Sequence, residues 1–257
     1  MKISLLQTDI VWGNPEANRT HAEGLISGLP KSDVYVLPEM FSTGFATEPE
    51  GIAEEDGSSL LWMQKMAKSL DAALAGSVAV CENNDGKKTY HNRFYFVKPD
   101  GTYEYYDKHH LFTYGGEHKR FTRGDKRVVV EFRGVRFLLQ ICYDMRFPTF
   151  ARNSAENPYD VALYVASWPT SRIGAWTTLA HARAIENQCY VVAVDRVGND
   201  PSCEYCGGTM LIDAYGNTQA ECERGKECCI TADIDLDALA DFRRKFPVLN
   251  DADTENF

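Results

Sequence analysis

The chain has 257 residues, a formal net charge of −10 and 44% hydrophobic residues. Its length allows a sizeable core, and no Pro/Gly/Ser-rich linker or internal repeat divides it, so we expect a single domain over residues 1–257. The acidic balance argues against nucleic acid and anionic membranes as partners, and no apolar run approaches the roughly 20 residues of a membrane span. With no signal-peptide pattern at its start, the sequence indicates a cytoplasmic protein.

The first half of the chain is predicted to alternate strands with two helices. Asn14 and Pro15 indicate the start of a helix that reaches Leu29, because Asn is a favoured cap and Pro a favoured first residue. A second helix, over 58–70, is predicted by a stripe of apolar residues at helical spacing. The expected strands are 3–9, 33–37, 75–81, 92–98 and 102–106, with a hairpin turn at 99–101 between the last two.

The second half has the same alternating character. Strands are predicted at 128–132, 135–141, 161–166, 190–195, 209–212, 218–221 and 230–234, and helices at 149–155, 176–187 and 236–246. Turns at 133–134 and at 214–217 join neighbouring strands into hairpins. Many strands with helices between them indicate the α/β class rather than a helical bundle or a pure β-sandwich.

Cys142 is the first candidate for a functional residue. It follows the apolar run 135–141, and Pro148 comes soon afterwards at the expected start of a helix. A strand–turn–helix elbow of this kind holds a side chain out of the sheet, where a nucleophile must stand. A cysteine considered alone is more often a buried core residue, so the assignment depends on partner residues.

Two other strand-like runs end in polar residues of the kind that such a nucleophile requires. Glu39 follows the run 33–38, and Lys108 follows the aromatic stretch 103–107. Glu39 has apolar neighbours on both sides, and burial of a carboxylate is costly unless it is paired. A Glu, a Lys and a Cys at three strand ends are therefore expected to form one site.

The chain has eight cysteines, and a cytosolic location argues against a disulfide framework among them. Cys203 and Cys206 have the spacing of half a zinc site, and the rest of such a site would have to come from Cys222, Cys228 and Cys229. The adjacent Cys228 and Cys229 would point to opposite faces of a strand. We therefore expect separate thiols and no bound metal.

The segments LPEMFSTGF, YDKHHLF and ICYDMRFP resemble the three signature boxes of the nitrilase, or carbon–nitrogen hydrolase, superfamily. The similarity continues through GEHKRFTRG, SWPTSRIGAW and ARAIENQCYVVAVDRVG, so it spans most of the chain. This resemblance implies a four-layer α-β-β-α sandwich and assigns the catalytic residues to Glu39, Lys108 and Cys142. It also places on Glu117 the additional carboxylate that many family members have beside the lysine. The runs MFSTGF, GGEH and SWP look most like the omega-amidase branch, whose members deamidate small 2-oxo acid amides.

The resemblance thus implies a thiol amidohydrolase that releases ammonia from a small carboxylated amide of the 2-oxoglutaramate or 2-oxosuccinamate type. Cys142 would attack the amide carbonyl while Glu39 carries its proton. Lys108, oriented by Glu117, would stabilise the oxyanion together with the backbone N–H of Tyr143. The cycle requires no metal or organic cofactor. An N-carbamoyl-amine hydrolase or a nitrilase would use the same catalytic residues, and a non-catalytic thiol or zinc scaffold is the alternative outside enzymes.

A carboxylated substrate requires a cation other than Lys108, ideally a guanidinium. Arg172, just past the strand 161–166, is the first candidate, and Arg146 is the second. Aromatic side chains are expected to wall a short pocket and to exclude long substrates: Phe41, Tyr114, Trp168 and Trp176. The resemblance further implies a homodimer or a larger homo-oligomer, formed by elements next to Cys142 and by the C-terminal region.

Overall fold

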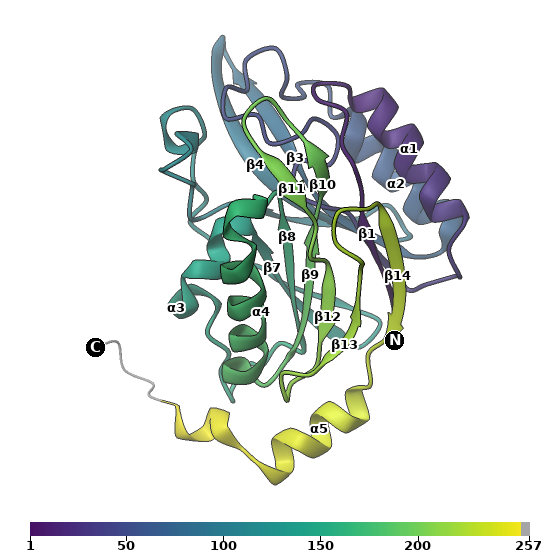
Figure 1. Cartoon of the computed structure of the whole chain (residues 1–257), viewed down its shortest axis with the longest axis vertical. Helices are drawn as coiled ribbons and strands as arrows, with labels where there is room; N and C mark the ends of the chain where they lie inside the picture. Colours follow the sequence, from purple (N-terminus) through teal and green to yellow (C-terminus); the bar gives the residue numbers. More distant parts are fainter. Residues whose placement is uncertain (253–257) are drawn as a thin grey trace.

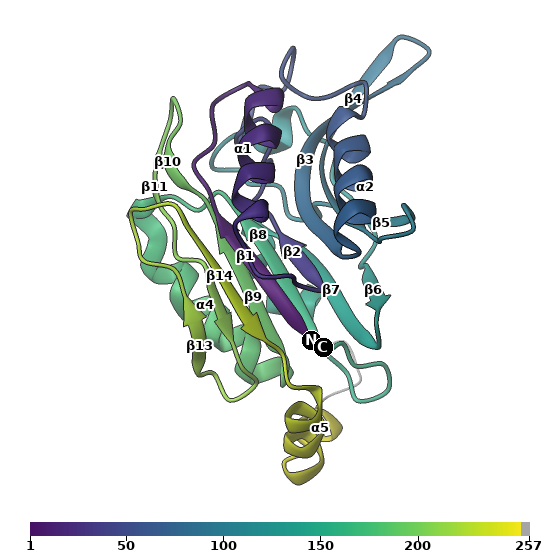
Figure 2. The ribbon, with the colours of Figure 1, turned by 90° about the vertical axis from the view of Figure 1, so that its right-hand side faces the viewer.

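Two six-stranded β-sheets pack face to face between layers of helices in the computed structural model, which describes residues 1–252 (Figures 1 and 2). Helices α1 (Pro15–Ser27) and α2 (Ser58–Leu70) cover the outer face of one sheet. Helix α4 (Ile173–Asn187) covers the outer face of the other. This four-layer arrangement confirms the fold class predicted from the sequence.

The first sheet is mixed. Its two central pairs are parallel, and the pairs toward its edges are antiparallel. In spatial order its strands are β14 (Cys228–Asp233), β1 (Lys2–Gln7), β2 (Val34–Val36), β3 (Ala73–Asn84), β4 (Lys87–Val97) and β5 (Tyr103–Asp107).

The second sheet has a parallel centre and antiparallel edges. In spatial order its strands are β13 (Thr218–Glu221), β12 (Met210–Ile212), β9 (Tyr190–Asp195), β8 (Val161–Ala166), β7 (Val135–Ile141) and β6 (Val129–Phe132). Every residue of β8 and β9 is buried, as is typical of parallel strands that are covered on both faces. The bounds predicted for β7, β8 and β9 from their apolar runs are confirmed.

The remaining elements are short. An antiparallel ribbon, separate from the two sheets, consists of β10 (Val197–Asn199) and β11 (Glu204–Cys206). The other helical segments are α3 (Pro148–Ala151), α5 (Leu236–Lys245) and the 3-10 helices η1 (Glu117–Lys119), η2 (Cys142–Arg146), η3 (Thr170–Arg172) and η4 (Val248–Asp251). Among the residues that the structure describes, no helix is long and apolar enough to cross a membrane.

Two regions differ from the strands predicted from the sequence. The β3–β4 hairpin continues to a turn at Asp85 and Gly86, well beyond the predicted strands 75–81 and 92–98. Its far end is polar and mostly exposed, so it lacks the burial pattern on which strand prediction depends. The β10–β11 ribbon escapes prediction because each of its strands has only three residues.

The fold gathers several strand ends at one edge of the sandwich. Most of the core lies between the two sheets and under α4, and a second cluster lies between the first sheet and helices α1 and α2. Because β7, β8 and β9 are parallel, their carboxyl ends meet at the same edge. Cys142 follows β7, Ser167 follows β8 and Asp195 ends β9. Glu39 reaches this edge from the loop after β2, where it bonds to Ser167.

Candidate active site

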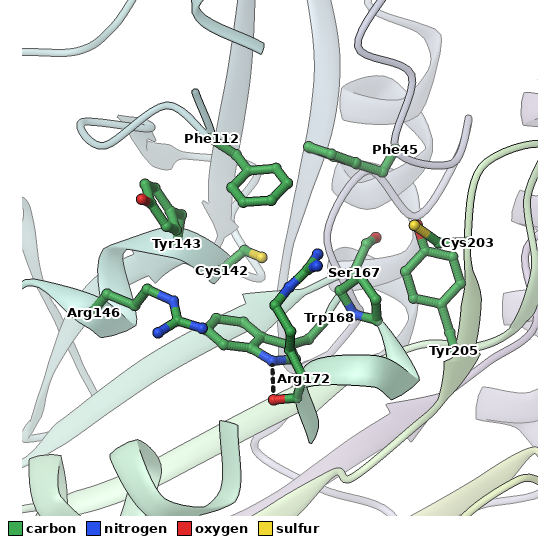
Figure 3. A pocket seen from close by; sticks show the side chains of 11 residues that line it. Phe45, Phe112, Cys142, Tyr143, Arg146, Ser167, Trp168, Arg172, Cys203 and Tyr205 are labelled. Atoms are coloured by element: carbon green, nitrogen blue, oxygen red, sulfur yellow. Dashed lines mark hydrogen bonds between the residues drawn. The ribbon is translucent and has the colours of Figure 1, made fainter. Parts of the chain in front are cut away.

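Cys142 begins the turn that directly follows β7. Its backbone φ is 45°, in the left-handed region that costs a residue with a side chain about 1–2 kcal/mol. Asp144 stabilises the turn, since its Oδ2 accepts hydrogen bonds from the N–H of Ile141 at 2.9 Å and from the hydroxyl of Tyr106 at 2.8 Å. The strained turn presents the Cys142 sulfur to a pocket, as the elbow in the sequence predicts (Figure 3).

The same aspartate joins the cysteine turn to the loop that carries Lys108. Asp144 Oδ1 accepts the backbone N–H of His110 at 3.0 Å and lies 2.8 Å from its ring Nδ1. The His110 ring stacks on Phe147 with 3.9 Å between ring centroids. His110 therefore has a packing role that fixes the two loops relative to each other.

Lys108 lies between two carboxylates, and all three side chains are fully buried. Its Nζ is 2.8 Å from Glu39 Oε1 and 3.0 Å from Glu117 Oε2. Glu117 Oε2 also accepts the N–H of Phe112 at 2.6 Å. The ammonium lies 5.2 Å from the ring centroid of Phe45, which lines the pocket. The structure thus brings the predicted Glu39, Lys108 and Glu117 into one cluster beside the pocket.

Two further groups hold this cluster, and neither is predicted from the sequence. Asn92, on β4, donates from Nδ2 to Glu39 Oε1 at 2.8 Å and to Glu117 Oε1 at 3.1 Å. The backbone N–H of Ser167 donates to Glu39 Oε2 at 2.8 Å. Both oxygens of Glu39 are therefore fixed. The sequence signal that could have indicated Asn92 is a polar residue before the apolar end of a strand.

Burial and charge set the protonation of the site. Burial raises the pKa of the Cys142 thiol well above its ordinary value, and the negative charge of Glu39 adds to the rise while Lys108 opposes it. For Lys108, burial disfavours the ammonium, but the carboxylates of Glu117 and Glu39 outweigh it and raise its pKa. Burial also raises the pKa of Glu117, against the opposing charge of Lys108. The resting site therefore combines a neutral thiol with a charged lysine.

The pocket contains about 410 Å³ of empty space, including its open mouth. No acidic side chain lines it, whereas two guanidinium groups do. Figure 3 shows Arg172 reaching toward the Cys142 sulfur and Arg146 lying against the Trp168 ring. Its lining residues are Phe45, Phe112, Cys142, Tyr143, Arg146, Ser167, Trp168, Pro169, Arg172, Cys203 and Tyr205.

The two arginines rest on aromatic rings rather than on acids. The Arg146 guanidinium is 5.0 Å from the centroid of Trp168, and that of Arg172 is 5.4 Å from the centroid of Phe112. Trp168 is itself fixed, because its indole N–H donates to the Arg172 carbonyl at 2.8 Å. Within residues 1–252 neither guanidinium forms an ion pair, so both can accept an anion from outside.

Only some of the residues that were predicted to form the pocket walls line the pocket. Tyr143, Arg172 and Trp168 line the pocket, but Phe41 does not, because it is 2% exposed and packs in the cluster under α1 and α2. Tyr114 is 86% exposed and lies outside the lining.

Trp176 is also buried away from the pocket, where its indole N–H donates to the Gly208 carbonyl at 2.8 Å. Phe45, Phe112 and Tyr205 supply the aromatic walls instead. They come from loops and from the ribbon, whose positions depend on the tertiary fold.

All eight cysteines lie within the described residues, and none of them forms a disulfide. In residues 1–252, no group of three or more His, Cys, Asp or Glu side chains is arranged to hold a metal ion. Cys203 lines the pocket, whereas Cys206 does not, and Cys222 bonds through Sγ to the Cys228 carbonyl at 3.3 Å.

Comparisons with known proteins give a consistent result over nearly the whole chain. The family model described as carbon-nitrogen hydrolase matches residues 2–244. The chain is 43% identical to the omega-amidase YafV of Yersinia enterocolitica over 254 residues, which are 98% of this chain and 97% of that protein. It is 38% identical to the 2-oxoglutaramate amidase of Bacillus subtilis, covering 97% and 96% of the two chains.

A solved structure agrees. XC1258 from Xanthomonas campestris, a CN-hydrolase superfamily protein with an arsenic adduct in its active site, superimposes with a TM-score of 0.94 and 41% identity. The alignment covers 100% of this chain and 98% of that chain.

Fold, site and comparisons together define a hydrolase of carbon–nitrogen bonds other than peptide bonds. The chain belongs to the carbon–nitrogen hydrolase family, as its signature segments predict. Its similarity to omega-amidases confirms the branch that the sequence indicated.

Proposed function

We propose that this protein is an omega-amidase, which hydrolyses the terminal amide of a small carboxylated amide and releases ammonia. One observation carries the proposal. Cys142 opens into a small pocket with two guanidiniums that form no ion pair within residues 1–252, while the charges of the buried Glu39 and Lys108 act on its sulfur. The names of the relatives, omega-amidase and 2-oxoglutaramate amidase, support the same activity.

The first half of the reaction acylates the enzyme. Because the Cys142 thiol is neutral at rest, it needs a base, and Glu39 takes the Sγ proton as the sulfur attacks the amide carbonyl carbon. The carbonyl oxygen becomes an oxyanion. The Lys108 ammonium and the backbone N–H of Tyr143 stabilise this charge, a contribution of roughly 3 kcal/mol per donor.

The tetrahedral intermediate then collapses. Its carbon–nitrogen bond breaks, Glu39 returns the proton to the leaving nitrogen, and ammonia departs from a Cys142 thioester. In the second half, Glu39 takes a proton from water, whose oxygen attacks the thioester carbon. The carbon–sulfur bond breaks, the sulfur regains a proton from Glu39, and the product is a carboxylic acid that loses its proton to solvent and leaves as a carboxylate.

Glu117 and Asn92 keep Lys108 in place. Glu117 is a second carboxylate in contact with the ammonium, and Asn92 donates one hydrogen bond to Glu117 and one to Glu39. Three groups therefore position the lysine, and it needs no movement to meet the developing charge. Such preorganisation is the main source of electrostatic catalysis.

The substrate is a short amide with a carboxylate at its other end, of the 2-oxoglutaramate or 2-oxosuccinamate type. Arg172 is the first candidate for the carboxylate, because its guanidinium has no ion-pair partner in the described part of the chain and reaches toward Cys142 in the pocket (Figure 3). Arg146 is the second candidate, although its position against Trp168 fits a wall equally well. The limited volume of the pocket favours small substrates.

A panel of substrates tests the proposal. Purified protein is assayed for ammonia release from small amides with and without a terminal carboxylate, from nitriles and from N-carbamoyl compounds. We expect the carboxylated amides to have the highest kcat/KM, and we expect Cys142→Ala to be folded but inactive. A preference for nitriles or for N-carbamoyl amines would assign the protein to another branch of the family.

We also propose that residues 1–257 work as one domain, in a homodimer or larger homo-oligomer, in the cytoplasm. Eight cysteines without a disulfide fit a reducing compartment. The apolar residues exposed near α5 support association between copies of the chain. No nucleic acid, membrane, metal or organic cofactor has a part in this scheme.

A further inference from the structure

Asp195 is a buried acid that the mechanism above does not use. It is the last residue of β9, and its side chain is fully buried. Its Oδ1 accepts the backbone N–H of Trp168 at 2.7 Å and that of Arg196 at 2.9 Å. Among the described residues, its Oδ2 has no hydrogen-bond partner. A buried carboxyl group left half unsatisfied requires an explanation.

The explanation is not an ion pair. Arg196 is adjacent in sequence, but its guanidinium points elsewhere and bonds to the Val197 carbonyl at 3.0 Å and to Asp9 at 3.1 Å. Burial, opposed by the two backbone hydrogen bonds, raises the pKa of Asp195 well above its ordinary value. A second carboxylate, that of Glu39, lies near Asp195 and adds to the rise of its pKa. Electrostatic stabilisation of the fold therefore does not explain why an acid is buried at this position.

Two consecutive peptide N–H groups connect Asp195 to the proposed base. The N–H of Ser167 donates to Glu39 Oε2 at 2.8 Å, and the N–H of Trp168, the next residue, donates to Asp195 Oδ1 at 2.7 Å. The two residues follow β8, which lies between the strands that end at Cys142 and Asp195. The orientation of the Ser167 N–H therefore depends on how the following peptide is held.

The same peptide carries the pocket wall. Trp168 lines the pocket, contacts the Arg146 guanidinium and bonds to the Arg172 carbonyl. Asp195 thus holds a two-residue segment in which Ser167 bonds to the proposed base Glu39 and Trp168 lines the pocket.

We propose that Asp195 is a positioning residue of the reaction, which holds the 167–168 segment so that Glu39 and Trp168 keep their working positions. The proposal rests on the proposed function of Glu39 as the base. This role requires a hydrogen-bond acceptor at the position of Asp195 Oδ1 and does not require a negative charge. An asparagine supplies the same acceptor in the same shape, whereas an alanine supplies none.

The test compares Asp195→Ala, Asp195→Asn and the matched control Asn187→Ala. Asn187 is equally buried and also makes two side-chain hydrogen bonds to the backbone, to Asn153 and Arg183, but neither of these partners lines the pocket, whereas Trp168, a partner of Asp195, does. kcat and KM are measured per folded molecule on the fastest substrate of the ammonia-release panel, whatever its class. Melting temperatures are measured in parallel.

We expect Asp195→Ala to lower kcat by about tenfold to hundredfold, the cost of a small misplacement of a catalytic group. Asp195→Asn should restore kcat to within about threefold of wild type. Asn187→Ala should lower the melting temperature as much as Asp195→Ala does but leave kcat unchanged.

A kcat for folded Asp195→Ala equal to that of wild type would overturn the proposal, because Asp195 would then serve stability alone. If that variant does not fold, Asp195→Asn decides the matter, and a loss of activity greater than about tenfold there would refute the acceptor role. Failure of the proposed function has a different signature. The wild type would then prefer a substrate other than carboxylated amides, while the ranking of the Asp195 variants on that substrate would still hold.

Discussion

Lys108 has the environment least expected for its residue type. Lysines usually cover surfaces, yet this one is fully buried between Glu39 and Glu117. Breaking a buried ion pair by removing one partner is far costlier than the pair itself is stabilising. The three residues must therefore be treated as one unit, in which removal of one charge leaves the other buried charges uncompensated.

Lys108→Met leaves both carboxylates buried without their cation. We expect the free energy of unfolding to fall by about 3–5 kcal/mol, with loss of turnover. Burial already raises the pKa of Glu117 against the opposing charge of Lys108, so removal of the lysine raises it further. Between its unfolded and folded pKa values, Glu117 then binds more protons in the folded state, and the variant gains stability as the pH falls. Thermal melts at several pH values should show the difference in Tm from wild type narrowing on acidification.

The double variant Lys108→Met, Glu117→Gln is the control. Because it removes one of the two uncompensated carboxylates, it should recover part of the stability at neutral pH without recovering ammonia release. A Tm difference that widens as the pH falls would contradict the assignment of charge in this cluster.

Arg172 is the residue to which we assign the carboxylate of the proposed substrate. In Arg172→Met we expect KM for carboxylated amides to rise by about 10- to 100-fold, on the order of the 1.5–3 kcal/mol of a charged hydrogen bond. A neutral amide of the same length is the control substrate, and its KM should change little. Arg146→Met, measured in the same way, separates the two candidates. Unchanged kinetics on carboxylated amides would remove Arg172 from the carboxylate site.

At the scale of elements, the β10–β11 ribbon forms one wall of the pocket (Figure 3). Tyr205, on β11, is held by its hydroxyl, which donates to Asp200 Oδ2 at 2.5 Å, and by the Arg196 guanidinium at 4.6 Å from its ring centroid. Because the ring is held at its hydroxyl and at its face, we expect the ribbon to limit the length of the substrate.

Tyr205→Ala should widen the pocket and admit longer amides. We expect kcat/KM to fall for the short carboxylated amide and to rise for one that is longer by two or three carbons, because each buried CH₂ contributes about 0.8 kcal/mol. Tyr205→Phe keeps the ring and is the matched control, with unchanged selectivity. An identical ratio of the two kcat/KM values in wild type and Tyr205→Ala would show that the wall lies elsewhere.

The sequence predicts elements well where burial determines them. Strands β7, β8 and β9 and helix α2 have the predicted bounds, because their apolar patterns reflect what covers them. The exposed end of the β3–β4 hairpin and the short ribbon carry no such pattern. Their shapes follow from tertiary contacts, which a local pattern does not contain.

The same reasoning applies to the site. Polar residues that follow strand-like runs are visible in sequence, and the structure gathers Glu39, Lys108 and Cys142 in one site. The direction in which a loop side chain points cannot be predicted from the local sequence. Phe41 packs under the helices, while Phe45, four residues later and past the left-handed Gly44, lines the pocket.

At the scale of the whole molecule, charge is distributed unevenly. The chain has a net charge of −10, yet the pocket lining contains two arginines and no acid. For the proposed carboxylated substrate, the arginines of the pocket therefore provide local attraction against the unfavourable net charge of the chain. Such an arrangement favours small anions that fit between the two guanidiniums over larger acidic molecules.

An exposed apolar patch near helix α5 indicates how copies of the chain would associate. Helix α5 lies at one end of the molecule (Figure 1), where Phe246 is 59% exposed and Tyr215 is 62% exposed. Both rings contact Phe242, so they form one apolar patch rather than scattered residues. Exposed apolar patches on soluble proteins commonly mark sites of association. We therefore expect a homodimer at micromolar concentration, with this patch in or beside the interface.

Light scattering on wild type and on Phe246→Glu tests this expectation, because a charge placed within an apolar interface opposes association through its desolvation cost. We expect wild type to have twice the mass of the chain and Phe246→Glu to shift toward the monomer. Leu61→Glu is the control, since Leu61 is a comparably exposed apolar residue, at 55%, on the outer helix α2. A monomeric wild type would refute the dimer. A dimer that Phe246→Glu and Leu61→Glu leave equally intact would place the interface away from α5, and the turn at Cys142 would then be the next surface to test.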